Sequence, residues 1–168
     1  ARAFGLRVIA WSRSLSPARA EELGVERCAD VDDIFRRADV VSIHVALKPE
    51  TRQLVNAARL ALMKPNAILI NTARGPIVDE AALYDALKDG LIAGAALDVF
   101  SKEPMTESPL FTLPNVVVTP HLGASTREAQ DKAGDAIADM VQLALAGDFV
   151  PYAVNVNAAD ANETLKPF

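Results

Sequence analysis

The sequence has little of several features that mark particular classes of protein. It contains one cysteine, Cys28, in 168 residues, so no disulfide can form within the chain and we expect a reducing compartment, the cytoplasm. No apolar run reaches the roughly 20 residues that span a bilayer, and the N-terminus lacks a signal-peptide pattern. The net charge is -5 and there is no stripe of Lys or Arg, which argues against nucleic acid and anionic membranes as partners. Small molecules and other proteins remain.

What is present is an alternation of strand and helix patterns. Half of the residues are apolar, and the length suits one domain with one core. Short apolar, β-rich runs alternate with helical segments, which predicts βαβ units and a parallel sheet covered by helices on both faces. Strands are expected at residues 6–11, 40–45, 67–71, 93–99 and 115–119, and helices at residues 17–23, 30–38, 56–64, 79–90 and 125–147.

Local signals place the helix ends. Ser16, Asn56 and Asp79 are N-cap residues, and a capping box at residues 125–128 opens a last helix that Gly147 closes. Residues 1–5 resemble the last turn of a helix closed by Gly5, so we expect sequence that precedes it. Residues 1–150 are predicted to form a partial domain, and the polar residues 151–168 a linker toward a further, absent domain.

Three side chains with chemical potential each follow a predicted strand. Arg74, Glu103 and His121 should gather at the carboxyl edge of a parallel sheet, where such sheets bind ligands. Arg74 can hold a carboxylate with two hydrogen bonds, and Gly75 beside it would let the backbone lie close to a ligand. His121 can exchange a proton with a hydroxyl or carbonyl oxygen, and Glu103 can orient its imidazole and favour the protonated form. This set suits a 2-hydroxy or 2-oxo acid.

The strings around these residues add a resemblance. Residues 71–80 (NTARGPIVDE), 96–104 (ALDVFSKEP) and 119–124 (TPHLGA) resemble the signatures of the D-isomer-specific 2-hydroxyacid dehydrogenases, in the right order and separation. The resemblance covers nearly the whole chain. It implies a Rossmann-like doubly wound sheet, an oxidoreductase that transfers hydride, and a catalytic set of Arg74 for the substrate carboxylate, His121 as acid/base and Glu103 as its partner. No metal is expected.

The same resemblance implies contacts to a nicotinamide cofactor. Asp98 matches the aspartate that bonds the carboxamide of the nicotinamide. The remaining positions implied to line the cofactor are Ser12, Arg13, His44, Val45, Thr51, Thr72, Ala73, Arg74, His121 and Gly123.

The chain departs from the family pattern in two places. The first strand and the glycine-rich turn of the dinucleotide fingerprint are absent, and so is the substrate domain, so we expect residues 1–168 alone to be inactive. At the end of the first visible strand, Ser12 stands where an acid would bind the ribose of NAD, and Arg13 follows it. Removal of the acid and addition of a cation favour a 2′-phosphate, so the cofactor is predicted to be NAD or NADP.

Other features concern the branch of the family and the assembly. The string TPHLGASTREAQ and the segment GDFVP that leads to residues 153–155 resemble the branch acting on D-3-phosphoglycerate, in serine biosynthesis. The strings near residues 11–14 and 75–76 resemble glyoxylate or hydroxypyruvate reductases, and a non-enzymatic corepressor that senses dinucleotide stays open. Small side chains recur at helical spacing along residues 129–144, which fits close packing of this helix on the sheet. The family resemblance instead implies a homodimer or higher oligomer formed through this domain.

Overall fold

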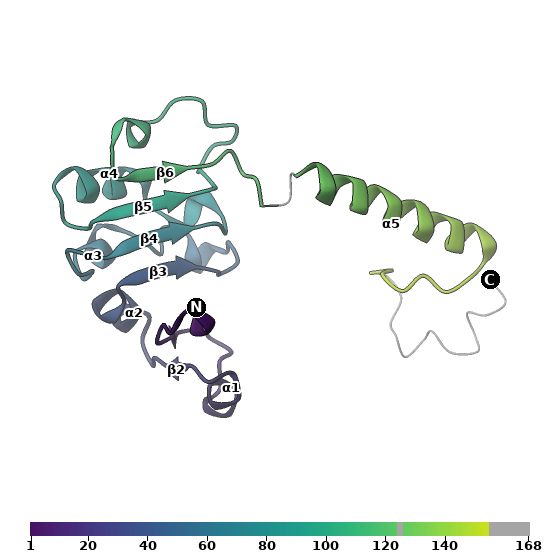
Figure 1. Cartoon of the computed structure of the whole chain (residues 1–168), viewed down its shortest axis with the longest axis horizontal. Coiled ribbons are helices and arrows are strands. Elements are labelled where there is room, and N and C mark those ends of the chain that lie inside the picture. The colour runs from purple at the N-terminus through teal and green to yellow at the C-terminus, as the bar shows by residue number, and fades with distance from the viewer. Residues whose placement is uncertain (124–125, 155–168) are drawn as a thin grey trace. The chain divides into compact units, whose positions relative to one another are not determined.

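The structure, a computed structural model, describes residues 1–123 and 126–154 (Figure 1). The chain divides into two compact units, Ala1–His121 and Leu122–Phe168, and each is described by itself. In the first unit the strands are β1 (Ile9–Ala10), β2 (Glu26–Arg27), β3 (Val40–Ile43), β4 (Ile68–Asn71), β5 (Gly94–Leu97) and β6 (Val116–Val118). Its helices are α1 (Pro17–Leu23), α2 (Val31–Arg37), α3 (Ala57–Leu60) and α4 (Glu80–Lys88), with 3-10 turns η1 (Arg2–Phe4), η2 (Pro49–Thr51), η3 (Gly75–Ile77) and η4 (Pro109–Thr112). The second unit contains α5 (Arg127–Ala146).

The strands form two parallel sheets in the described part of the chain. One has the order β3-β4-β5-β6, visible as a stack in Figure 1, and the other pairs β1 with β2. Ile43, Asn71, Leu97 and Val118 lie side by side in register, so β3 to β6 end at the same level. The predicted parallel α/β fold of the Rossmann-like type is confirmed, and residues 6–11 and 40–45 fall in different sheets.

One face of the four-stranded sheet carries the core. Alternate strand residues such as Val41 and Leu69 are at most 2% exposed and pack in one apolar cluster with helix residues. Phe35 of α2, Leu60 of α3 and Leu83 of α4 are all nearly inaccessible and belong to the same cluster. Burial of side chains of this size contributes roughly 1.5–3 kcal/mol each, which fixes the strand ends that carry the site.

Within the first unit, α2, α3 and α4 cover one face of the four-stranded sheet, and coverage of the other face by helices stays a prediction. Val40 is 50% exposed, Ile68 is 40% exposed and Val117 is 67% exposed, all on the face opposite α2, α3 and α4. The burial pattern of β3 therefore alternates instead of being continuous. An apolar run such as residues 40–43 shows that a strand is apolar on both sides, and says nothing of whether both sides are covered.

Most predicted helix ends are confirmed. The side chains of Ser16, Asn56 and Asp79 accept hydrogen bonds from backbone N–H groups in the first turns of α1, α3 and α4. Helix α3 ends at Leu60, four residues before the predicted end.

The cap of α5 is one residue later than predicted. Thr126 is the N-cap and accepts from the Ala129 N–H, whereas Ser125 lies outside the described residues. Gly147 closes α5 with φ of 75°, as predicted. No helix of the described residues is long and apolar enough to cross a membrane. The predicted linker begins among described residues without helix or strand, and residues 155–168 lie outside them.

Candidate active site

Hydrogen bonds from the Asn71 side chain stabilise the loop after β4. This residue ends β4 and is fully buried, and its side chain spans the loop. Its Nδ2 donates to the Arg74 carbonyl at 3.1 Å, and its Oδ1 accepts from the Ala73 N–H at 3.1 Å. Because a buried amide that lost these partners would cost about 1–3 kcal/mol, the loop is fixed in one conformation. Arg74 is thereby presented with its side chain exposed at the carboxyl edge.

Gly75 brings the Arg74 loop against the loop after β5. A Cβ at this position would lie 1.8 Å from the carbonyl carbon of Phe100 and 2.4 Å from the Ser101 nitrogen. Gly75 is buried, so the close approach that its missing side chain permits is to backbone of this chain. The expectation that Gly75 leaves room for a ligand is therefore corrected: it leaves room for the loop that carries Glu103.

Glu103 and His121 form the central pair. Glu103 Oε2 lies 2.7 Å from His121 Nδ1, and Glu103 Oε1 accepts from the Phe100 N–H at 2.9 Å. The hydrogen bond with His121, then the one from Phe100, lowers the pKa of the Glu103 carboxyl, and the charge of Arg74 adds to the effect. An ionised carboxylate only accepts, so Nδ1 carries a proton in this arrangement and Nε2 is the atom left for a substrate.

The backbone of His121 is in the left-handed region, with φ of 56°. This conformation costs a residue other than glycine on the order of 1–3 kcal/mol, although histidine tolerates it better than most. His121 lies three residues after the end of β6, and its side chain contacts Glu103 of the loop after β5. Arg74, Glu103 and His121 are thus brought together by the loops after β4, β5 and β6, as the sequence predicts.

Asp98 lies at the same edge, directly after β5. It is 9% exposed, and its backbone N–H donates to the Asn71 carbonyl at 3.0 Å. Thr119, directly after β6, donates from Oγ1 to Asp98 Oδ1 at 2.5 Å. A buried carboxylate held in one orientation at a ligand-binding edge is suited to accept from an amide N–H₂ group.

The other predicted cofactor residues fall on two loops. Ser12 and Arg13 are exposed after β1, where Ser12 Oγ accepts from the Ser14 N–H at 3.3 Å. After β3, the His44 ring nitrogen Nε2 lies 2.8 Å from Ser42 Oγ. Thr51 is 7% exposed, donates to the Ala46 carbonyl at 2.7 Å and accepts from the Lys48 N–H at 2.8 Å. The hydroxyl of Thr51 therefore shapes its own loop.

The remaining predicted positions differ in their surroundings. Thr72 is exposed at the end of β4, whereas Ala73 and Val45 are half-buried and pack against the core. Gly123 belongs to the second unit. Contacts of all these residues with a cofactor stay predictions.

Three supporting residues were missed at the level of sequence. They are Asn71, Thr119 and Glu80, whose Oε1 accepts from the Ser101 N–H at 2.6 Å. Asn71 and Thr119 stood inside the quoted strings, and a polar residue that ends an apolar run was the available signal. The hydrogen bond from the Ser101 N–H to Glu80 joins residues that are 21 positions apart, so no local sequence pattern reveals it.

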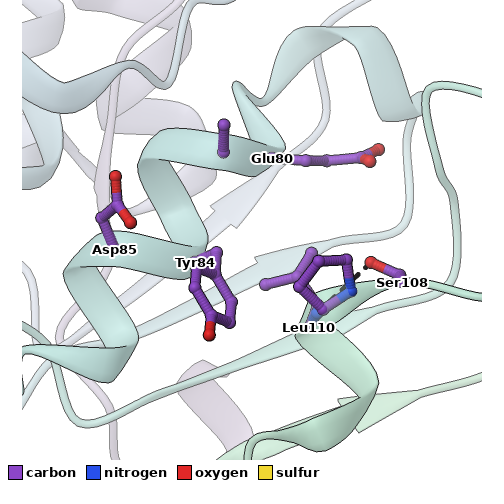
Figure 2. A pocket seen from close by; sticks show the side chains of 7 residues that line it. Glu80, Tyr84, Asp85, Ser108 and Leu110 are labelled. Atoms are coloured by element: carbon purple, nitrogen blue, oxygen red, sulfur yellow. Dashed lines mark hydrogen bonds between the residues drawn. The ribbon is translucent and has the colours of Figure 1, made fainter.

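A shallow pocket lies on the other side of Glu80, between α4 and η4 (Figure 2). It is lined by Glu80, Ala81, Tyr84, Asp85, Ser108, Pro109 and Leu110. Ser108 Oγ accepts from the Leu110 N–H at 3.3 Å, which is the dashed line in Figure 2. None of Arg74, Glu103 and His121 lines this pocket, so it is separate from the candidate catalytic residues.

Comparison with known proteins identifies the class. Residues 1–123 match the family described as D-isomer specific 2-hydroxyacid dehydrogenase, NAD binding domain. The chain therefore belongs to this family of oxidoreductases, and the matched part is its cofactor-binding domain.

Individual relatives show which members of the family the chain is similar to. The chain is 54% identical over 166 residues to D-3-phosphoglycerate dehydrogenase of Mycobacterium tuberculosis, a match that covers 99% of this chain and 31% of the relative. It is 44% identical over 155 residues to glyoxylate reductase of Thermococcus litoralis, covering 92% of this chain and 46% of the relative. D-lactate dehydrogenase of Lactobacillus jensenii, solved with NAD+, superposes with a TM-score of 0.81 at 30% identity, covering 92% and 50% of the two chains. The chain thus spans between about a third and a half of these proteins.

The donor set fits a nicotinamide cofactor at two places. Asp98 offers a buried, oriented acceptor for a carboxamide, and Ser12 and Arg13 offer polar and cationic groups at the end of β1. The sequence contains no glycine-rich turn between a strand and a helix to hold a pyrophosphate. Residues of this chain would therefore hold the nicotinamide and adenosine ends.

Proposed function

We propose that the complete natural protein is an NAD(P)-dependent dehydrogenase that interconverts D-3-phosphoglycerate and 3-phosphohydroxypyruvate. The observation that carries the chemistry is the 2.7 Å contact between Glu103 Oε2 and His121 Nδ1, beside the exposed Arg74. The substrate rests on the 54% identity to a D-3-phosphoglycerate dehydrogenase over nearly the whole chain.

Each residue has one task in this proposal. Arg74 binds the substrate carboxylate with two charge-assisted hydrogen bonds and so places the neighbouring carbon. In the oxidation direction, Nε2 of His121 accepts the hydroxyl proton while the hydride leaves that carbon, and in reduction the same atom returns the proton. Glu103 keeps the ring in the required orientation and stabilises the imidazolium that forms. The nicotinamide, when bound, supplies the hydride acceptor.

Two other functions stay open, of which one has support from a relative. Glyoxylate or hydroxypyruvate reduction would use the same three side chains, and the 44% identity to a glyoxylate reductase favours it as second candidate. A dinucleotide-sensing corepressor would also be compatible with these residues, but it would turn over no 2-oxo acid.

Turnover by the complete natural protein tests the proposal. We expect reduction of 3-phosphohydroxypyruvate with NADH or NADPH at a higher kcat/KM than reduction of glyoxylate or hydroxypyruvate. A preference for glyoxylate would favour the glyoxylate or hydroxypyruvate reductase. If no 2-oxo acid is reduced, the dinucleotide-sensing corepressor is the remaining candidate function. The 168 residues alone should be inactive, because they contain no glycine-rich turn that would hold the pyrophosphate.

Substitution of the catalytic residues tests their roles. Arg74→Ala and His121→Ala should each abolish most turnover and leave cofactor affinity nearly unchanged, since each lost charge-assisted bond is worth roughly 1.5–3 kcal/mol. Lys88→Ala is the matched control, because it removes a cation at the C-terminal end of α4, outside the candidate catalytic residues. Normal kcat/KM in Arg74→Ala or His121→Ala would remove that residue from the mechanism.

We also propose a cytoplasmic homodimer or higher oligomer. The reducing compartment agrees with Cys28, which is 3% exposed and whose thiol pKa is raised by burial, so that it resists oxidation. The oligomer rests on the family resemblance, and sedimentation of the complete protein measures it.

A further inference from the structure

An ion pair joins the loop after β1 to the turn after β3. Arg13 Nη1 donates to Glu50 Oε1 at 3.2 Å, across 37 positions of sequence. The two side chains are 58% and 60% exposed, so both are within reach of a ligand at this edge. Among the described residues, Glu50 is the ion-pair partner that the structure gives Arg13.

The Glu50 carboxyl is ionised at neutral pH. Hydrogen bonding from its own backbone, then from Arg13, lowers the pKa of the Glu50 carboxyl. Glu50 is also the middle residue of η2, next to Thr51, whose hydroxyl makes three hydrogen bonds within the loop. The Glu50 carboxylate therefore stands on an ordered loop and contacts Arg13.

Both loops lie where the proposed function puts the adenosine end of the cofactor. Ser12 and Arg13 follow β1, and the loop from His44 to Thr51 follows β3. Arg13 is the cation that a 2′-phosphate would need, since a phosphate binds best to a guanidinium through paired N–H groups. In this structure one of those N–H groups is directed to Glu50.

We propose that Glu50 limits the recognition of NADP by occupying Arg13, and that this ion pair shifts the preference between the two dinucleotides toward NAD. This inference rests on the proposed function, because it needs the cofactor to bind at this edge. A 2′-phosphate must displace Glu50 from Arg13 to use the cation, whereas the free 2′-hydroxyl of NAD has no such competition.

The size of the effect follows from the exposure of the pair. Exposed ion pairs contribute little, and screening by salt reduces them further. Removing Glu50 should therefore raise the affinity for NADP+ about two- to fivefold and leave that for NAD+ unchanged. The gain should shrink as ionic strength rises toward 1 M, where charges interact over only about 3 Å.

Calorimetric titration of NAD+ and NADP+ into the complete natural protein tests this without turnover. The variants are Glu50→Gln, Arg13→Ala and the double variant, with Glu107→Gln as control for the loss of one exposed carboxylate. We expect Glu50→Gln to raise the ratio of NADP+ to NAD+ affinity, Glu107→Gln to leave it unchanged, and Glu50→Gln to have no effect in the Arg13→Ala background.

Three results would overturn the inference. An unchanged ratio in Glu50→Gln would show that Glu50 does not oppose the phosphate. A gain that persists without Arg13 would show that Glu50 acts on the ligand directly and not through the ion pair. A similar rise of the affinity ratio in Glu107→Gln would show that the effect comes only from the change in net charge. If the unaltered protein binds neither dinucleotide, the proposed function fails and this inference fails with it.

Discussion

Replacement of Gly75 by alanine should disrupt the active site through backbone alone. The added Cβ would lie 1.8 Å from the Phe100 carbonyl carbon, 2.0 Å from its oxygen and 2.4 Å from the Ser101 nitrogen. Ordinary contacts between carbon atoms are about 3.5–4.0 Å, so the two loops would have to separate by more than about 1.5 Å. No change of rotamer relieves this clash, since every atom involved belongs to the main chain.

The cost should appear in stability and in catalysis. Overpacking of a filled interior costs about 1–3 kcal/mol, and we expect the upper end because three rigid atoms are involved. Separation of the loops also moves Arg74 away from Glu103 and His121. A misplacement of about 1 Å at reacting groups lowers turnover on the order of 100-fold, so kcat should fall by about that factor.

Urea unfolding and steady-state kinetics of the complete natural protein measure the two effects. Gly134→Ala, in the interior of α5, is the matched control, because its added Cβ would meet no atom of the described residues within 4 Å apart from its chain neighbours and the backbone of its own helix. That variant should be more stable by about 0.5–1 kcal/mol and keep its kcat. A Gly75→Ala protein with an unchanged unfolding midpoint and normal kcat would refute the reasoning.

Two further substitutions test the pairs at the same edge. Thr119→Val should lower NADH affinity roughly tenfold, about 1.5 kcal/mol for a lost bond to a carboxylate, while ADP-ribose binds normally and Thr119→Ser retains both affinities. Equal weakening of NADH and ADP-ribose would show instead that Thr119 only supports the fold. For Glu103, a lowered folded-state pKa adds stability above the unfolded value of about 4.3 and loses it as pH falls through the folded value. The difference in unfolding free energy from Glu103→Gln should thus be full near pH 7 and shrink below about pH 4.3, and a difference independent of pH between 3 and 7 would contradict this.

Local signals in the sequence predicted local structure well. Ser16, Asn56 and Asp79 act as caps because an N-cap bond joins a side chain to a backbone N–H two or three residues away. Strand β2 was not predicted, because it has no such local signal. Glu26 and Arg27 are polar and exposed, so neither alternation nor an apolar run marks them, and only their pairing with β1 makes them a strand.

The sequence predicted which candidate residues lie at one edge of the sheet, but not the residues that support them. The positions of Arg74, Glu103 and His121 after three strands were enough to place them at one edge. The role of Gly75 was not predictable, because it depends on how closely two loops approach that are 25 positions apart in sequence. The same holds for the ion pair of Arg13 and Glu50, which joins loops of strands in different sheets.

The register of the sheet is what turns three separate strings into one layer of functional groups. Asn71, Leu97 and Val118 are aligned, so the residues that follow them begin their loops at the same height. The Asp98 N–H donates to the Asn71 carbonyl and the Thr119 N–H to the Leu97 carbonyl, which extends the ladder one step into the site. A slip of one residue in β5 would turn the Asp98 carboxylate to the opposite face and break its bond with Thr119. The core that fixes this register, on the face of α2, α3 and α4, is therefore as necessary to the proposed chemistry as the candidate catalytic residues themselves.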